Sequence, residues 1–212
     1  MKLVVLGPTG RIGRQVVRRA LTEGHWVTAV ARNPEAVTCV HDNLTVVPGD
    51  VLERETLYAP LAAADAVVFA VGSAGRGPTI VRSQGISTVA KVMRADNVAR
   101  LIVLSPSAVA ISPRATPARK LTLRFLVHKI QRNPFNDVER MEDELRYTDL
   151  DWSIVRSSTL RDGSPTGSYV VVPDGQVRRE RPVTVPDLAD FVVRHAADRT
   201  ARHDTVTVTG PA

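Results

Sequence analysis

The chain has only one cysteine and lacks a long apolar run, and these two features exclude several classes of protein. Cys39 stands alone among 212 residues, so it cannot close an internal disulfide or join a metal site of the usual cysteine spacing. No run approaches the roughly 20 apolar residues that a helix needs to cross a bilayer. The first apolar run breaks at Gly7, unlike that of a signal peptide. We therefore expect a cytoplasmic protein with no membrane partner.

Two catalytic patterns are missing as well. The five histidines do not recur at a spacing that would build a metal site, and no metal is expected. A hydrolase with a Ser-His-Asp triad on an α/β sheet would carry a Gly-x-Ser-x-Gly turn around its nucleophile. The sequence contains no such turn, which argues against this type of hydrolysis.

What is present is the composition of an ordinary globular protein. Hydrophobic residues make up 43% of the chain and charged residues 24%. A chain of this length buries about 70% of the surface that it exposes when unfolded, which is enough for a real core. We expect a single domain over residues 1–212.

The strongest motif is a glycine-rich turn near the N-terminus. A branched apolar run from Leu3 to Leu6 leads into the turn, and the residues up to Glu23 have helical periodicity. Glycines let backbone amides approach an anion, and the following helix adds the positive end of its dipole. The Gly-x-x-Gly-x-x-Gly spacing therefore predicts the pyrophosphate loop of a dinucleotide site, with a purely structural turn as the alternative. Its candidate residues are Gly7, Thr9, Gly10, Arg11, Ile12 and Gly13.

The end of the second expected strand bears on the choice of cofactor. The run from Trp26 to Ala31 predicts this strand, and Arg32 follows it directly. An acidic residue here would bond the ribose hydroxyls and select NAD, whereas an arginine can accommodate the 2′-phosphate of NADP. With Arg11 in the loop that faces it, Arg32 predicts NADPH over NADH. The alternative is that Arg32 is a solvated turn residue.

Strands and helices alternate along most of the chain. Further strands are expected at Leu44 to Val47, Ala66 to Val71, Arg100 to Leu104, Trp152 to Val155, Tyr169 to Val172 and Thr205 to Thr209. Helices are expected from near Leu52 and at Thr79 to Arg94, Phe135 to Arg146 and Pro186 to Ala197. Short connections between alternating elements predict an α/β fold, a doubly wound (Rossmann) parallel sheet with helices on both faces, here with a small C-terminal extension on the substrate side.

Ligands of such sheets bind at the carboxyl ends of the strands. The exits of the later strands therefore supply the other candidate cofactor residues, which are Asp50, Val51, Ala70, Val71, Gly72 and Ser105. Asp50 is expected either to contact the adenine amino group or to cap the helix begun near Leu52.

Positive charge is concentrated in one segment. The net charge is +6, and Arg114 to Arg132 carries six lysines and arginines with no acidic residue. Nucleic acid binding is one interpretation of such a cluster. The segment lacks interleaved aromatic residues and any helix-turn-helix or zinc pattern, so a solvated face or a lid over an anionic ligand is the favoured one.

Taken together, the motifs resemble a family, the atypical short-chain dehydrogenase/reductases, and within it the NAD(P)H-binding group of NmrA-like proteins and flavin reductase (biliverdin-IXβ reductase). The resemblance covers almost the whole chain. Besides the glycine turn it rests on Gly49 to Val51, Asp65 to Gly72, Leu101 to Ser107, Arg140 to Arg146, Leu150 to Arg156, Pro165 to Tyr169 and Val185 to Asp190. It implies a nicotinamide cofactor across the strand ends, with hydride passed to a planar, electron-poor acceptor.

The catalytic residues depart from the family's patterns. The Tyr-x-x-x-Lys pair of ordinary short-chain dehydrogenases is absent, because no tyrosine is followed by lysine four residues later. The resemblance to flavin reductase places Ser107, or Ser105, and Thr159 beside the nicotinamide as candidate catalytic residues. Thr159 falls where that pattern has a histidine, and a threonine cannot act as an acid near neutral pH, although its hydroxyl can orient a substrate or a water.

These observations predict an NADPH-dependent oxidoreductase that transfers hydride to a small planar acceptor, such as a flavin, a quinone or a carbonyl compound. The partner is a small-molecule substrate, and the protein is expected to be a monomer or a homodimer. The alternative is a non-catalytic, NADP-binding redox sensor of the NmrA-like type. The absence of the Tyr-x-x-x-Lys pair fits that alternative equally well.

Overall fold

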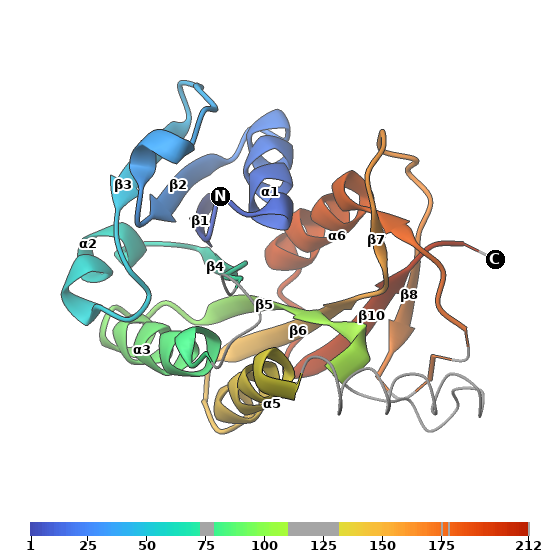
Figure 1. The fold of residues 1–212 in the computed structure, drawn as a ribbon. Helices are drawn as coiled ribbons and strands as arrows, with labels where there is room; N and C mark the ends of the chain where they lie inside the picture. Colours follow the sequence, from blue (N-terminus) through green and yellow to red (C-terminus); the bar gives the residue numbers. More distant parts are fainter. Residues whose placement is uncertain (73–78, 110–131, 175, 178, 212) are drawn as a thin grey trace.

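An eight-stranded sheet forms the centre of the molecule, with the order β3-β2-β1-β4-β5-β6-β10-β8 (Figure 1). The computed structural model describes residues 1–72, 79–109, 132–174, 176–177 and 179–211. Neighbouring strands are parallel except for β8, which runs antiparallel to β10. The strands are β1 (Lys2–Leu6), β2 (Trp26–Ala31), β3 (Leu44–Pro48), β4 (Ala66–Phe69), β5 (Arg100–Pro106), β6 (Asp151–Ser157), β8 (Val170–Pro173) and β10 (Asp204–Thr209). A separate pair is formed by β7 (Leu160–Arg161) and β9 (Val183–Thr184).

Helices cover both faces of this sheet, which confirms the doubly wound α/β fold (Figure 1). One face carries α1 and α6, which pack against each other, and the other carries α3 and α5. The helices are α1 (Arg11–Thr22), α2 (Tyr58–Leu61), α3 (Val81–Ala95), α5 (Arg132–Arg146) and α6 (Val185–Ala197). Short 3-10 turns lie at η1 (Pro34–Ala36), η2 (Arg54–Thr56) and η3 (Ser107–Val109).

The core lies in two layers, one on each side of the sheet. In β4, Val67 and Phe69 pack into the layer under α3 and α5, whereas Ala66 and Val68 pack into the layer under α1 and α6. All four side chains are buried, as expected for an apolar run in a parallel strand that is covered on both faces.

The helix expected from near Leu52 is the main difference from the sequence-based prediction. The structure has instead the 3-10 turn η2 and the four-residue helix α2. Pro60 explains the interruption. A proline has no N–H to donate, and its ring would clash with the carbonyl four residues earlier, at Thr56, in a continuous helix.

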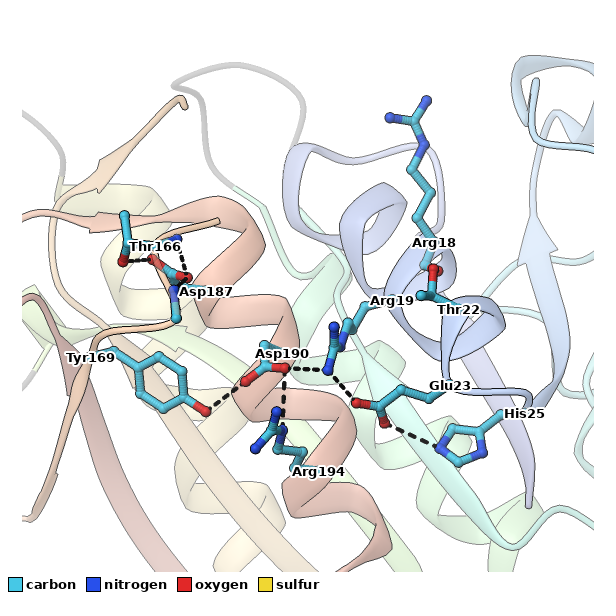
Figure 2. A network of polar contacts seen from close by, with 11 residues as sticks. Arg18, Arg19, Thr22, Glu23, His25, Thr166, Tyr169, Asp187, Asp190 and Arg194 are labelled. Atoms are coloured by element: carbon cyan, nitrogen blue, oxygen red, sulfur yellow. Dashed lines mark hydrogen bonds and ion pairs between the residues drawn. The ribbon is translucent and has the colours of Figure 1, made fainter. Parts of the chain in front are cut away.

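An ion network ties α1 to α6 on one face of the sheet (Figure 2). The carboxylate of Asp190 accepts a hydrogen bond of 2.8 Å from the Tyr169 hydroxyl and lies 2.7 Å from Nη2 of Arg19. Burial, and then the bond to Asp190, raise the pKa of Tyr169 to about 12. The phenol therefore stays a donor, and it anchors the chain leading into β8 on α6.

Two sequence predictions concern parts of the chain that the structure does not describe. The basic residues from Arg114 to Lys129 lie outside the described residues, as does the glycine-rich exit after Gly72. Within the ranges that are described, no helix is both long enough and apolar enough to cross a membrane.

Candidate cofactor site

A cavity of about 380 Å³ opens at the carboxyl ends of β1, β2, β3 and β4. It lies where the strand order reverses, because the chain passes from β1 outward to β2 on one side and β4 pairs with β1 on the other. This is the point at which doubly wound sheets bind ligands. The lining residues are Gly7, Thr9, Gly10, Val30, Ala31, Arg32, Asn33, Ala36, Gly49, Asp50, Val51, Ala70, Val71, Gly72 and Val81.

The glycine turn is too tight for side chains at two positions. Gly7 has a φ of +84°, and a Cβ there would lie 2.8 Å from the carbonyl oxygen of Ala70. At Gly13 a Cβ would lie 2.1 Å from the carbonyl oxygen of Gly7. The first turn of α1 therefore packs directly on the loop, and the loop on the end of β4. This close packing holds the backbone of the turn at the cavity wall.

The N-terminus of α1 is open toward an anion. Gly10 is its N-cap residue, and among the described residues no side chain caps the helix and no acidic residue lies in its first turn. The first N–H groups of a helix have no partner within it and carry the positive end of its dipole. A pyrophosphate fits this set of donors, since glycine leaves the approach to them free.

Arg32 and Asp50, two of the candidate cofactor residues, both line the cavity. Arg32 is exposed, so its guanidinium is accessible to a ligand. One carboxylate oxygen of Asp50 accepts a 3.0 Å hydrogen bond from the N–H of Leu52. Asp50 thus holds the turn after β3 and lines the cavity, but among the described residues it caps no helix, because the helix expected from near Leu52 does not form.

Arg11, expected in the loop facing Arg32, is not among the residues that line the 380 Å³ cavity. Its guanidinium is 2.9 Å from the carboxylate of Asp162, and the two residues line a separate cavity of about 350 Å³. The reason is that Arg11 is the first residue of α1, and its side chain leaves the helix toward Asp162. Ile12 is half-buried and packs against the core, and Gly13 is buried. None of these three residues is among those that line the 380 Å³ cavity.

The two candidate serines at the carboxyl end of β5 both donate to carboxylates. The hydroxyl of Ser105 donates to Glu142 on α5 at 2.6 Å, and the hydroxyl of Ser107 donates to Glu180 at 2.6 Å. Ser105 is 3% exposed and Ser107 is 7% exposed. Neither serine is among the residues that line the 380 Å³ cavity.

Glu142 is part of a buried network under the end of β6. Arg156 donates from Nε to one Glu142 oxygen at 3.1 Å and from Nη2 to the other at 2.6 Å. Burial alone would raise the pKa of Glu142, but the hydrogen bonds from Arg156 and Ser105 and the charges of Arg156 and Arg146 lower it below its ordinary value. Glu142 is therefore held as a carboxylate.

Thr159 and Ser107 each contact the segment from Glu180 to Val183. The carbonyl of Thr159 accepts a 3.0 Å hydrogen bond from the N–H of Val183, while its side chain is exposed. The hydroxyl of Ser158 donates to the carbonyl of Arg181 at 2.7 Å. Since Glu180 precedes Arg181 directly, the segment from Glu180 to Val183 runs between the exits of β5 and β6. Ser107 and Thr159 thus both contact this segment, and neither is among the residues that line the 380 Å³ cavity.

Sequence reasoning missed Arg82, Glu142 and Glu180. Arg82 stands in the first turn of α3, and its Nε donates to the carbonyl of Val71, a residue of the cavity wall, at 3.3 Å. Burial, opposed by the charge of Asp137, lowers the pKa of Arg82. An arginine directly after a glycine-rich strand exit was the available signal for Arg82. No comparable local signal marks the two glutamates, and across the described ranges no group of metal-ligating side chains is present.

Comparison with known proteins agrees with this geometry. A family model described as NAD(P)H-binding matches residues 7–199. Divinyl chlorophyllide a 8-vinyl-reductase of Oryza sativa subsp. indica is 26% identical over 227 residues, with 99% of this chain and 54% of the relative covered. Photosystem II assembly factor Ycf39 of Synechocystis sp. is 24% identical over 207 residues, with 92% and 58% covered. The chain thus spans little more than half the length of these relatives.

A solved structure shares the fold. It is a short-chain dehydrogenase/reductase of Veillonella parvula in complex with NADP, which superposes with a TM-score of 0.81 at 19% identity and covers 100% of this chain and 95% of that chain.

Proposed function

The chain belongs to the NAD(P)H-binding family, and from this premise we propose that it is an NADPH-dependent oxidoreductase that transfers hydride to a small planar acceptor, such as a flavin, a quinone or a carbonyl compound. The observation that carries the proposal is the cavity of about 380 Å³ at the strand ends, with an uncapped helix N-terminus and Arg32 in its surroundings. Reductases among the relatives, and the NADP bound to the structural neighbour, support it.

Each part of the cavity has a role in this proposal. The N–H groups at the start of α1 hold the pyrophosphate, and Arg32 pairs with the 2′-phosphate. The free carboxylate oxygen of Asp50 faces the adenine amino group. When bound, the cofactor supplies the hydride, and the protein supplies orientation and electrostatics. The proton that completes reduction of a flavin or a quinone comes from water.

The proposal is tested by NADPH oxidation with purified protein and a panel of flavins, quinones and carbonyl compounds. Gly10→Asp is the most informative variant. Aspartate is a favourable N-cap residue, and a Cβ at Gly10 meets its nearest atom at 3.4 Å, so the fold is retained. Its negative charge faces the pyrophosphate, and we expect cofactor binding and turnover to be lost.

Gly10→Asn is the matched control for this variant. It has the same shape and capping ability without the charge, and we expect it to bind the cofactor at least about tenfold more tightly than Gly10→Asp, which corresponds to about 1.4 kcal/mol. Equal affinity of the two variants would count against a pyrophosphate at the start of α1. Absence of oxidation with every acceptor would count against the reductase.

A second function is favoured by one specific observation: among the described residues, the candidate side chains for the nicotinamide end are hydroxyls and include no acid. Ser105 and Ser107 both donate to carboxylates, and Thr159 replaces the histidine of the flavin reductase pattern. A cofactor-sensing protein that binds NADP without turnover needs no such acid. Tight binding of NADPH together with no oxidation across the acceptor panel would support the sensor over the enzyme.

A further inference from the structure

The hydrogen bonds of the two serines at the carboxyl end of β5, Ser105 and Ser107, have a fixed direction. A carboxylate has no proton to give, so each serine must be the donor in its contact with glutamate. A hydroxyl carries one proton and two lone pairs. The protons of Ser105 and Ser107 are therefore committed to Glu142 and Glu180, over 2.6 Å in each pair. What each hydroxyl can still offer to another group is its lone pairs.

Ser107 lies closer to the surface than Ser105. Ser105 and Glu142 are 3% and 2% exposed, enclosed between β5 and α5, and Arg156 occupies both oxygens of the glutamate. Ser107 begins η3 at the exit of β5, and its partner Glu180 is only half-buried. The Ser107–Glu180 pair thus lies at the carboxyl end of β5. The Ser105–Glu142 pair lies deeper, between β5 and α5.

The position of Ser107 matches the far end of a dinucleotide. The exits of β1 to β4 line the 380 Å³ cavity, and β5 is the next strand, since Phe69 of β4 lies opposite Val103 of β5. A dinucleotide that has its adenosine beside β2 and its pyrophosphate at the glycine turn extends toward β5. Its nicotinamide end, and any acceptor stacked there, meets the exit of β5.

We propose that Glu180 is a positioning residue that fixes Ser107 as a hydrogen-bond acceptor, so that this end of the site selects a ligand group that donates an amide N–H. The inference rests on the proposed function and deepens it, because it defines the polarity of the site beside the transferred hydride. Two ligands can supply the same chemistry: the carboxamide of the nicotinamide itself, and a cyclic amide N–H of the electron acceptor.

Two matched pairs of probes distinguish these sources. In the first pair, NADP⁺ is compared with its 3-acetylpyridine analogue, in which a methyl group replaces the amide nitrogen and the carbonyl is kept. In the second pair, lumiflavin is compared with 3-methyllumiflavin, which lacks the imide N–H. Dissociation constants are measured by calorimetry for the wild type and for Ser107→Ala, Ser107→Thr, Glu180→Gln and Glu144→Gln. Glu144 is an exposed glutamate of α5 and serves as the control.

The wild type is expected to bind the N–H member of one pair about five- to tenfold more tightly, the effect of one hydrogen bond to a partly buried acceptor. Ser107→Ala should abolish this preference and Ser107→Thr should keep it. Glu180→Gln should reduce or reverse it, because the glutamine amide donates to Ser107 and releases the serine proton toward the ligand. Glu144→Gln should leave it unchanged. A preference in the first pair identifies the cofactor as the source, and one in the second pair identifies the acceptor.

Equal affinity within both pairs, or a preference that survives in Ser107→Ala, would overturn the inference. Each readout is a ratio of two affinities measured on the same variant. A general loss of stability lowers both affinities and therefore does not change the ratio. These ratios are also independent of turnover. NADP⁺ binding with the expected ratios but without NADPH oxidation would contradict the reductase and support the polarity of the site, whereas no NADP⁺ binding at all would overturn both.

Discussion

Arg32 is the residue on which the choice between NADPH and NADH depends. It is exposed at the exit of β2 and lines the cavity. A guanidinium that pairs with the 2′-phosphate contributes charge-assisted hydrogen bonds of about 1.5–3 kcal/mol. We expect Arg32→Ala to weaken NADPH binding by about tenfold or more and to leave NADH binding unchanged.

This prediction is checked by fluorescence titration of both cofactors. Arg140→Ala, which removes an exposed arginine of α5, is the control and should change neither affinity. An unaltered ratio of NADPH to NADH affinity in Arg32→Ala would show that Arg32 is a solvated turn residue.

Gly13 is a residue at which one methyl group should disturb the fold. A Cβ there would come within 2.1 Å of the Gly7 carbonyl oxygen, a backbone atom that can move only with the whole turn. Overpacking of this kind costs about 1–3 kcal/mol. We expect Gly13→Ala to lower the free energy of unfolding by at least that amount in urea titrations.

Gly10→Ala provides the comparison, because its Cβ would have its nearest contact at 3.4 Å. It should change the free energy of unfolding by less than about 1 kcal/mol. If Gly13→Ala were as stable as Gly10→Ala, the loop would not be packed on the helix as the structure shows.

For single residues, the sequence predicts where the backbone needs glycine better than it predicts which side chains bond to each other. The glycines of the turn and Arg32 follow from a local motif, and the structure places Gly7, Gly10 and Arg32 at the cavity. The partners of Ser105 and Ser107 are 37 and 73 residues away in the chain, and Asp162 is 151 residues from Arg11. Nothing local in the sequence identifies such distant contacts.

The start of α3 is held by a residue of another helix. Asp137 of α5 is 1% exposed, and its carboxylate accepts from the backbone N–H groups of Arg82 and Ser83 at 3.1 and 3.0 Å. Loss of this cap leaves two half-buried N–H groups without their acceptor. We expect Asp137→Ala to reduce the free energy of unfolding by about 2–3 kcal/mol and to speed hydrogen exchange at these two amides.

Asp143→Ala is the matched control on the same helix. The Asp143 side chain is 69% exposed and pairs with Arg146 over 3.1 Å. Surface pairs of this kind contribute little, so the change should stay within about 0.5 kcal/mol. Similar losses in both variants would mean that Asp137 does not cap α3.

The buried ion pair of Glu142 on α5 and Arg156 on β6 should make the free energy of unfolding depend on pH. Hydrogen bonds from Arg156 and Ser105, together with the charges of Arg156 and Arg146, outweigh the effect of burial and lower the pKa of Glu142 in the folded state. Its contribution to stability is therefore complete above the pKa of an unfolded glutamate and is lost as the pH falls through the lowered value. Glu142→Gln should cost about 3 kcal/mol near neutral pH, because the buried Arg156 loses one of its two carboxylate partners and keeps only Asp174.

Thermal unfolding from neutral to acid pH checks this prediction. The midpoint of Glu142→Gln should fall less steeply in acid than that of the wild type. Glu144→Gln should follow the wild-type curve, since Glu144 is exposed. Parallel curves for the wild type and Glu142→Gln would contradict the assignment.

At the scale of elements, periodicity located the long helices well and failed between β3 and β4. The segments that end at Arg94 and at Ala197 have apolar residues at helical spacing. The structure has α3 and α6 there, and both helices bury residues along their length. Near Leu52 the same kind of pattern was interrupted by Pro60, whose effect on the preceding turn outweighs the spacing of the apolar residues.

For the whole molecule, cofactor binding should appear as added stability. A ligand that binds only the folded state raises the free energy of unfolding by about 2.7 kcal/mol at a hundredfold excess over its dissociation constant. We expect NADPH to raise the unfolding temperature more than NADH at equal concentration. The difference should disappear in Arg32→Ala. No shift with either cofactor would contradict the proposed site as a whole.

The arrangement of the sheet could be predicted because it follows from the order of strands and helices along the whole chain. Alternating strands and helices with short connections predict a doubly wound sheet with its ligand site at the carboxyl ends of the strands, and the structure has this fold. The place of the last strands was not predictable, because no local pattern tells whether β10 lies inside or outside β8.

The position of β10 has a consequence for biosynthesis. β10 lies between β6 and β8, although the ribosome makes it after both. Until Asp204–Thr209 has emerged, β6 presents an open edge, and β8 lacks the neighbour with which it pairs in the finished sheet. Open edges of this kind pair readily with other chains. During the interval between the synthesis of β6 and that of β10, a nascent chain therefore carries an open strand edge.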